Sequence, residues 1–290
     1  MTSLTGRHAF VTGANRGIGA AIARHLAAAG ADVTLCVRTP ASAAGLVTEL
    51  AEHGGRFRVV QADVTDAAAL ARACAEAEAI APVDILVNNA GTAETAPFHR
   101  SDATLFQRML DVHLMAPVRA AQAFLPGMLA RGWGRIVNVA SVAGLGGAPY
   151  ITAYAAAKHA EVGFTRALGA ECGPKGVLVN AVCPGYVDTD MVHGAVDRLA
   201  AKTGITPAYA VATILREAGQ ARLVTPDEVA AAVLDYCRPD ATATGETRAL
   251  LGADASAARA PPRERRAGRW PGSRRRTSSG RSHPTAAWRR

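Results

Sequence analysis

The chain has 290 residues, 49% of them hydrophobic, which is enough for one large domain with a sizeable core. No run approaches the roughly 18 consecutive apolar residues of a membrane span, and the first residues lack the pattern of a secretory signal. The five cysteines form no CxxC pair, which argues against a zinc site or a disulfide framework. We therefore expect no metal and a reducing, cytoplasmic compartment.

The net charge of +8 comes from the C-terminal segment. Residues 255–290 hold 11 Arg and one Glu, whereas the preceding residues hold 21 Lys and Arg against 23 Asp and Glu. The segment is also rich in Pro, Gly and Ser and shows no helical or strand periodicity, so we expect a disordered tail beyond a domain of residues 1–254. Its arginines, with Trp270 and Trp288, leave nucleic-acid binding open as an alternative to a solvated tail without function.

Short apolar runs alternate with helical patterns along the chain. The runs predict strands at 8–13, 32–38, 57–64, 84–91, 135–141, 177–185 and, weakly, 247–253. Helices are expected at about 17–30, 41–53, 66–79, 102–131, 152–172 and 226–237. Most runs are continuously apolar, as in strands covered on both faces. The pattern predicts a doubly wound α/β fold with one parallel sheet of about seven strands and helices on both faces.

Residues 192–222 interrupt this alternation with helical stretches divided at Thr206 and Pro207. Ligands of doubly wound sheets bind outside the carboxyl ends of the strands, and this segment follows such an end. We interpret it as a substrate lid, with a surface helix pair that does not gate as the alternative.

A glycine-rich turn, TGANRGIG, lies between the first strand and the first helix. Gly13, Gly17 and Gly19 would let the backbone turn sharply and approach a pyrophosphate, which the free N–H groups of the helix would bind. Its place after a strand and before a helix favours a dinucleotide site over a purely structural turn.

Two arginines indicate which dinucleotide is bound. The second strand ends at Val37 and Arg38, where folds that prefer NAD usually carry an acid, and Arg16 lies in the glycine turn. Two guanidinium groups suit a 2′-phosphate. We predict NADP(H), with NAD(H) as the alternative if either arginine is only a surface charge.

Tyr154 and Lys158 are four residues apart in a helical pattern, so they project from one face. A free phenol with a pKa near 10 transfers protons poorly at neutral pH, and a nearby ammonium lowers that pKa. The chain has only three lysines against 29 arginines. A compact ammonium here can also reach ribose hydroxyls, which a planar guanidinium would fit badly.

The combination of motifs resembles the short-chain dehydrogenase/reductase family. TGANRGIG, NNAG at 88–91, Ser141, YAAAK and NAVCPGYVDT occur in that family's order and spacing, over about residues 5–246. The likeness is strongest to the branch of 3-oxoacyl-carrier-protein reductases, acyl-CoA-linked hydroxyacyl dehydrogenases and polyketide ketoreductases. It implies a Rossmann-type fold that binds a nicotinamide dinucleotide.

The resemblance also implies the roles of single residues. Ser141 would hydrogen-bond the substrate carbonyl, Tyr154 would transfer the proton, and Lys158 would orient the ribose and tune the tyrosine. Asp63 would contact the adenine, the NNAG residues would line the cofactor cleft, and Thr189 would hold the carboxamide. The full set of expected cofactor residues is Gly13, Asn15, Arg16, Gly17, Ile18, Gly19, Arg38, Asp63, Val64, Asn89, Ala90, Gly91, Tyr154, Lys158, Pro184, Gly185, Val187 and Thr189.

Two positions depart from the family pattern. His113 stands where the family usually has an asparagine that links the lysine to solvent through water. A neutral imidazole both donates and accepts, so His113 either keeps this relay or is only a packed residue. Near the C-terminus, TGETRALLGADA runs into the basic tail instead of the family's usual ending, which puts the last strand and the usual tetramer in question.

These features predict an NADP(H)-dependent oxidoreductase that interconverts a ketone and a secondary alcohol. Reduction of a 3-oxoacyl thioester or related β-keto compound, carried by acyl-carrier protein or CoA, is the best interpretation of the branch. The alternatives are a hydroxyacyl-CoA or other secondary-alcohol dehydrogenase working oxidatively, a nucleic-acid or acidic-surface binder, and a cofactor-binding regulator without turnover. We expect a homo-oligomer, dimer or tetramer, with no membrane partner.

Overall fold

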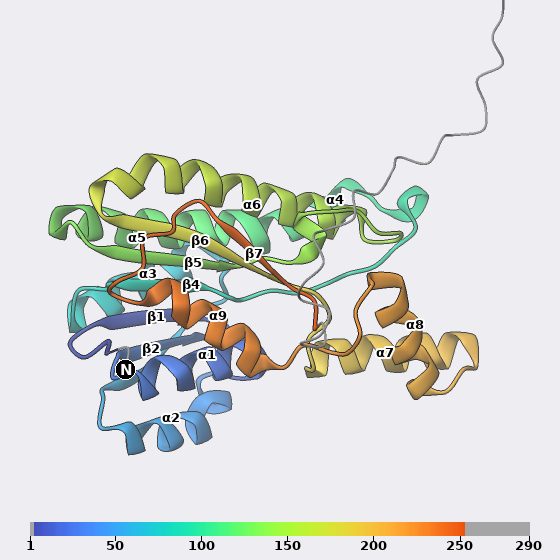
Figure 1. The fold of residues 1–290 in the computed structure, drawn as a ribbon, viewed down its shortest axis with the longest axis horizontal. Helices are drawn as coiled ribbons and strands as arrows, with labels where there is room; N and C mark the ends of the chain where they lie inside the picture. The colour runs from blue at the N-terminus through green and yellow to red at the C-terminus, as the bar shows by residue number, and fades with distance from the viewer. Residues whose placement is uncertain (1–2, 253–290) are drawn as a thin grey trace, which may run out of the picture. The chain divides into compact units, whose positions relative to one another are not determined.

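The computed structural model describes residues 3–252 of the chain, and the expectations for residues 255–290 lie outside them. Within the described part the chain forms one parallel sheet with helices on both faces, as predicted (Figure 1). Its strands are β1 (His8–Thr12), β2 (Asp32–Val37), β3 (Phe57–Gln61), β4 (Ile85–Asn88), β5 (Gly134–Val139), β6 (Val177–Pro184) and β7 (Thr247–Leu250).

The sheet order is β3-β2-β1-β4-β5-β6-β7, and every pairing is parallel. The order reverses between β1 and β4, and such a switch point opens a crevice at the carboxyl ends of the strands. The strand that the sequence predicted weakly is present, because β7 pairs with β6 in the register Ala181 to Thr247 through Pro184 to Leu250.

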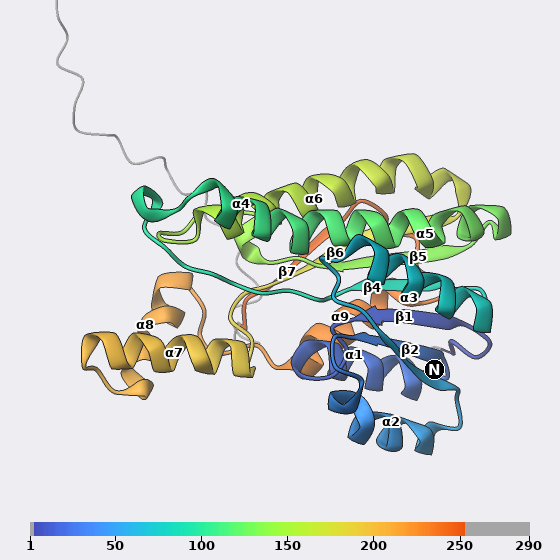
Figure 2. The same cartoon turned by 180° about the vertical axis from the view of Figure 1, so that it is seen from behind.

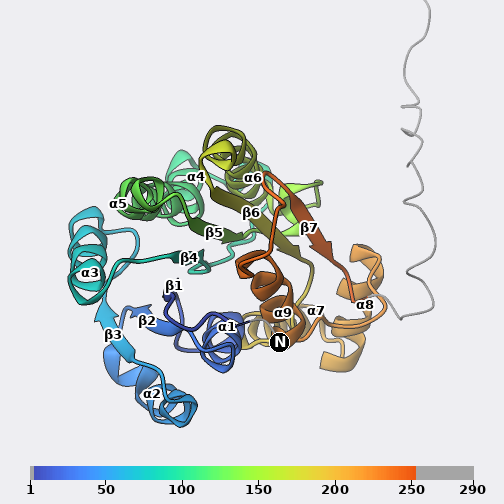
Figure 3. The same ribbon diagram turned by 60° about the vertical axis from the view of Figure 1, so that its left-hand side comes forward.

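The helices fall in two layers, and Figure 3 shows the sheet between them. One layer contains α1 (Gly17–Ala28), α2 (Ala44–Leu50) and α9 (Pro226–Cys237). The other contains α3 (Ala67–Ile80), α5 (Ala116–Arg131) and α6 (Thr152–Cys172), with α4 (Ala103–Leu110) against α6. The remaining helices, α7 (Asp190–Thr203) and α8 (Pro207–Ala218), lie beyond the strand ends (Figure 2).

Burial on both faces explains the continuous apolar runs. In β1, Ala9 and Val11 pack in the core with α1 and α9, whereas Phe10 packs in the opposite core, with its ring 5.0 Å from that of Phe124 in α5. All residues of β5 and β6 are buried. A half-exposed sheet would show alternating polarity instead.

The expected helix over 102–131 is continuous but irregular. Between α4 and α5 the chain makes a π-helical turn, η4 (Asp111–Met115). Pro117 has no N–H to donate to the carbonyl of His113 one turn earlier, and its ring crowds that carbonyl, so a regular α-helix is disfavoured there. Such π-turns occur frequently at functional sites.

Two further segments differ in detail from the sequence expectation. The helix expected at 41–53 is short α2 between two 3-10 turns, η1 (Pro40–Ala43) and η2 (Ala51–His53). The remaining 3-10 turns are η3 (Phe98–Arg100), η5 (Val142–Gly144) and η6 (Gly173–Lys175). Among residues 3–252 no helix combines the length and the apolar character that a membrane crossing requires.

Candidate active site

The glycine turn lies directly beyond β1, at the switch point of the sheet. Gly13 and Gly17 have positive φ angles of 64° and 52°, a region that side chains other than glycine adopt at a cost. A Cβ on Gly19 would collide with the carbonyl oxygen of Gly13. The turn therefore requires glycines and keeps its backbone open at the N-terminus of α1, where a pyrophosphate would fit.

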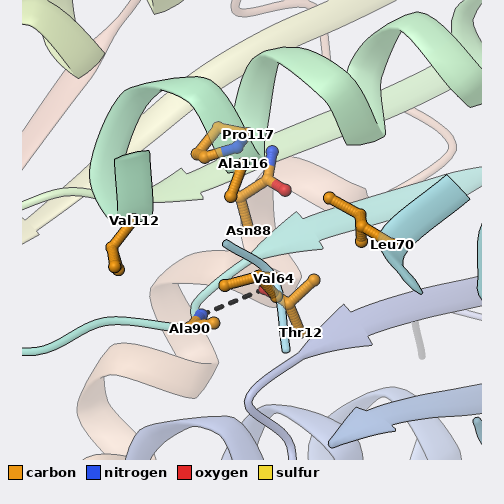
Figure 4. A pocket seen from close by; sticks show the side chains of 8 residues that line it. All are labelled: Thr12, Val64, Leu70, Asn88, Ala90, Val112, Ala116 and Pro117. Atoms are coloured by element: carbon orange, nitrogen blue, oxygen red, sulfur yellow. Dashed lines mark hydrogen bonds between the residues drawn. The ribbon is translucent and has the colours of Figure 1, made fainter. Parts of the chain in front are cut away.

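The end of β4 fastens this turn to the rest of the cleft. The Asn89 amide Nδ2 donates to the carbonyl oxygens of Thr12 at 2.9 Å and Gly13 at 3.1 Å. The Thr12 hydroxyl accepts the backbone N–H groups of Asn89 at 2.9 Å and Ala90 at 3.0 Å. Figure 4 shows the hydrogen bond between Ala90 and Thr12 beside a small cavity. The lining of this cavity includes the predicted cofactor residues Val64 and Ala90.

The nucleotide end of the cleft carries the predicted charges. Arg38 follows β2 and is exposed. Two hydrogen bonds that the Asp63 carboxylate accepts from Thr65 are the main cause of its lowered pKa, and the charge of Arg38 lowers that pKa further. Arg16 precedes α1 and forms an exposed ion pair with Asp190 of α7 at 3.3 Å. Asn15 donates to the Ser42 hydroxyl at 3.1 Å, and Ile18 packs partly buried against the core.

The end of β6 brings the last predicted residues to the same side of the sheet. Pro184 ends the strand, Val187 is buried, and Thr189 is the residue before α7. The sequence did not point to Gln220, whose Oε1 accepts the Tyr186 N–H at 2.7 Å and would collide with a Cβ on Gly185. Gln220 thus fixes the loop that leads into α7.

Ser141 lies two residues after the end of β5 and caps the turn η5. Its hydroxyl accepts the Ala143 N–H at 3.1 Å and donates to the Pro184 carbonyl at 3.5 Å. The latter bond is long, so the O–H can turn to another acceptor at small cost.

Tyr154 and Lys158 lie one turn apart on α6, as predicted. The Lys158 Nζ lies 6.0 Å from the centroid of the half-buried Tyr154 ring. Burial alone would lower the pKa of Lys158, but the nearby charge of Glu161 raises it above its ordinary value, with Tyr154 contributing. The lysine therefore stays an ammonium near the phenol, where its charge favours the phenolate.

His113 lies in the π-turn with its ring edge-on to Tyr154, at a centroid distance of 5.2 Å. Burial, with the charge of Lys158 adding to it, lowers the pKa of His113 to about 3, so the ring is neutral. Nε2 lies 2.7 Å from the Thr92 carbonyl and is therefore the protonated nitrogen. Nδ1 then carries a lone pair, and it is one of two buried side-chain atoms without a hydrogen-bond partner among the described residues.

Nothing in this arrangement assembles a metal centre. Among residues 3–252 no three His, Cys, Asp or Glu side chains lie close enough together to hold an ion. The polar groups lie instead along the crevice expected at the carboxyl ends of the strands. The open glycine backbone follows β1, and the phenol, the hydroxyl and the ammonium lie beside the ends of β5 and β6.

The fold and this cleft are those of a dinucleotide-dependent oxidoreductase, and the comparisons identify its family. The model of the family described as short chain dehydrogenase matches residues 7–200, and the chain belongs to that family. It is thus an enzyme of the NAD(P)-dependent dehydrogenase/reductase class.

Three relatives illustrate the range of similarity. Short-chain reductase protein NovJ of Streptomyces niveus is 41% identical over 241 residues, 82% of this chain and 90% of that protein. D-beta-hydroxybutyrate dehydrogenase of Cupriavidus necator is 37% identical over 230 residues, 79% of this chain and 89% of that protein. The structure of an Agrobacterium tumefaciens 3-oxoacyl (acyl-carrier-protein) reductase with NADP bound gives a TM-score of 0.78 at 36% identity, covering 86% of this chain and 95% of that one.

Proposed function

We propose that the protein is an NADP(H)-dependent reductase that interconverts a ketone and a secondary alcohol. The observation that carries the proposal is that Ser141, Tyr154 and Lys158 meet beside the ends of β5 and β6. Ser141 Oγ donates to the Pro184 carbonyl, and Lys158 Nζ donates to the Val139 carbonyl and lies 6.0 Å from the centroid of the Tyr154 ring. NADPH, when bound, supplies the hydride. The protein groups then have to hold the carbonyl and deliver one proton.

Each of the three residues has one task in this reaction. Ser141 donates its O–H to the substrate carbonyl oxygen in place of Pro184. Tyr154 donates its phenolic proton to that oxygen as negative charge develops on it. Lys158 stabilises the phenolate that remains, because its ammonium is buried nearby in a medium of low dielectric.

We propose that His113 positions a water of the solvent chain through which Tyr154 regains its proton. Its neutral ring holds Nε2–H on Thr92 and keeps the Nδ1 lone pair beside the tyrosine. An acceptor in this position can take a hydrogen bond from a water that bridges to Lys158. A histidine with such a low pKa does not itself become charged during the cycle.

The preference for NADP(H) is supported by the charges at the nucleotide end. Arg38 is exposed beyond β2, and no acid occupies the end of that strand. Arg16 is held only by a surface ion pair, which is worth about 0–1 kcal/mol and yields readily to a 2′-phosphate. The Agrobacterium reductase structure contains NADP.

For the substrate we propose a 3-oxoacyl thioester or related β-keto compound. One relative is named for a 3-oxoacyl group on acyl-carrier protein and another for D-β-hydroxybutyrate, and both compounds carry the reacting oxygen on the β carbon of an acyl chain. The hydroxybutyrate dehydrogenase also supports the second candidate, oxidation of a β-hydroxyacyl compound at the same site. We further propose a homo-oligomer and a cytoplasmic location, the latter supported by five free, buried cysteines.

A screen of NADPH oxidation tests this function. β-Keto thioesters, cyclic ketones, steroids and simple aldehydes are offered to the wild type and to Tyr154→Phe, which removes only the hydroxyl. We expect turnover of a β-keto compound by the wild type, its loss in the variant, and NADPH binding within about threefold of wild type, a difference below 1 kcal/mol. Turnover by Tyr154→Phe at the wild-type rate would refute the proton-transfer role.

A further inference from the structure

Helix α6 carries an acid on its buried face. The buried positions of this helix are Ala153, Ala157, Lys158, Glu161, Val162, Thr165, Gly169 and Cys172. Lys158 and Glu161 are on adjacent turns of this face, their side chains are 5% and 2% exposed, and Nζ lies 2.8 Å from Oε2. Buried acids are rare unless they are paired, so this carboxylate has a specific partner in the lysine of the reaction.

The pair leaves Lys158 one donor for the cofactor. An ammonium has three N–H donors, and two of them are directed to Glu161 at 2.8 Å and to the Val139 carbonyl at 2.9 Å. These two acceptors belong to α6 and β5, which fixes Nζ between the helix and the sheet. The third N–H is thereby given a direction before any cofactor arrives.

The other titratable groups around the pair are neutral or lie apart from it. His113 faces it from η4 as a neutral ring. Cys183 of β6 is a protonated thiol, because burial raises its pKa to about 11. Arg166 of α6 is exposed and donates to Thr247. Burial raises the pKa of Glu161, and the charge and hydrogen bond of Lys158 oppose that rise, so the two buried groups hold each other as an ion pair at 2.8 Å.

We propose that Glu161 is a positioning residue of the reaction, which holds the Lys158 ammonium charged and aimed at the ribose of the cofactor and moderates its pull on Tyr154. This inference rests on the proposed function for its catalytic consequence, but not for the pairing itself. A neutral residue at 161 would leave a buried ammonium without an opposite charge.

Removing the carboxylate has two consequences, and both lower the pH at which ketone reduction is lost. Burial without an opposite charge lowers the pKa of Lys158, so the ammonium is lost at a lower pH. While it remains charged, it favours the phenolate of Tyr154 without compensation from Glu161, whereas the reaction needs the protonated phenol as its acid. Both changes move the alkaline limb of kcat/KM to lower pH.

The pairing is tested first without turnover, by NMR of the cofactor-free protein labelled with ¹³C in lysine. The chain has only Lys158, Lys175 and Lys202, and the last two are exposed, so Lys175→Arg and Lys202→Arg assign the signals. In the wild type we expect Lys158 to lose its proton at a higher pH than the two exposed lysines do. In Glu161→Gln we expect it to lose its proton at a lower pH than they do. An unchanged order in Glu161→Gln would overturn the proposal.

The catalytic consequence is tested on the substrate found in the screen. In Glu161→Gln we expect the alkaline limb of kcat/KM to shift down by about one pH unit or more and the Kd for NADPH to rise about tenfold. Glu161→Asp should recover part of both, and Glu171→Gln, on the exposed face of α6, should match the wild type. If Glu161→Gln does not fold, Glu161→Leu replaces it and should show the same shift.

The outcomes separate this inference from the proposed function. If Lys158 titrates in Glu161→Gln as it does in the wild type, or if the pH profile of a folded variant is unshifted, the positioning role is refuted even if the enzyme reduces β-keto compounds. A shifted Lys158 titration with no ketone reduced by the wild type leaves the pairing established and refutes the proposed function.

Discussion

A buried chain of hydrogen bonds fixes α6 to the sheet, and Thr165 is its middle link. Asn88 Nδ2 donates to Asn138 Oδ1, Asn138 Nδ2 donates to Thr165 Oγ1, and Thr165 Oγ1 donates to the Glu161 carbonyl, each at 2.8 Å. Asn138 and Thr165 are fully buried. The chain joins β4 and β5 to the helix that carries Tyr154 and Lys158.

Thr165→Val keeps the shape of the side chain but removes the hydroxyl. The Asn138 Nδ2–H is then buried with no acceptor, and such an orphaned donor costs about 1–3 kcal/mol. We expect the free energy of unfolding, measured by urea denaturation at pH 7, to fall by that amount. Thr48→Val is the control, because Thr48 makes the same bond to the carbonyl four residues earlier but lies on the exposed face of α2. This change should alter stability by less than about 0.5 kcal/mol.

A double-mutant cycle isolates the interaction itself. In Asn138→Leu the donor that Thr165→Val would orphan is already absent, so the double variant should be more stable than the sum of the single losses predicts, by about 1 kcal/mol. Strictly additive losses, or a Thr165→Val cost no larger than that of Thr48→Val, would refute the reasoning.

Two further predictions concern the charge at each end of the cleft. Arg38→Ala should raise the KM for NADPH about tenfold and leave the KM for NADH within about twofold, because a guanidinium–phosphate bond is worth about 1.5–3 kcal/mol. Steady-state assays with both cofactors measure this, and equal changes in the two KM values would contradict the assignment of Arg38 to the 2′-phosphate. His113 has a folded pKa of about 3, below its ordinary 6.5, so its contribution is complete above pH 6.5 and is lost as the pH falls. Between pH 7 and pH 5 the wild type should therefore lose about 2 kcal/mol more stability than His113→Asn in urea titrations, and parallel losses would show that the ring titrates normally.

The sequence predicted the sheet well because its strands are buried on both faces. Apolar runs as continuous as those of β5 and β6 have few other interpretations when helices alternate with them. The irregular turn η4 was not predicted, although Pro117 signals it. A proline one turn into a helix favours several local outcomes, and packing against α6 selects among them.

The residues of the site also divide into those that the sequence predicted and those that it did not. Tyr154 and Lys158 were predicted because a fixed spacing on one helix brings them together. Gln220 was not, since its contact with Tyr186 joins segments 34 residues apart in the chain. Glu161 was visible in principle, because an acid three residues after a lysine, within an apolar helical stripe, has to be buried if the stripe is. A charged residue taken alone favours the opposite prediction, a position on the solvated surface.

In a chain that is poor in lysine, the structure gives a reason for the lysine at position 158. Lys175 and Lys202 are exposed, where arginine would serve equally well, whereas Lys158 is buried. A guanidinium has five donors in one plane, and the contacts at this position supply two acceptors, Val139 and Glu161. An ammonium uses both and keeps one donor for a ribose hydroxyl. Charge alone would allow either residue, so the number and direction of the donors decide for lysine.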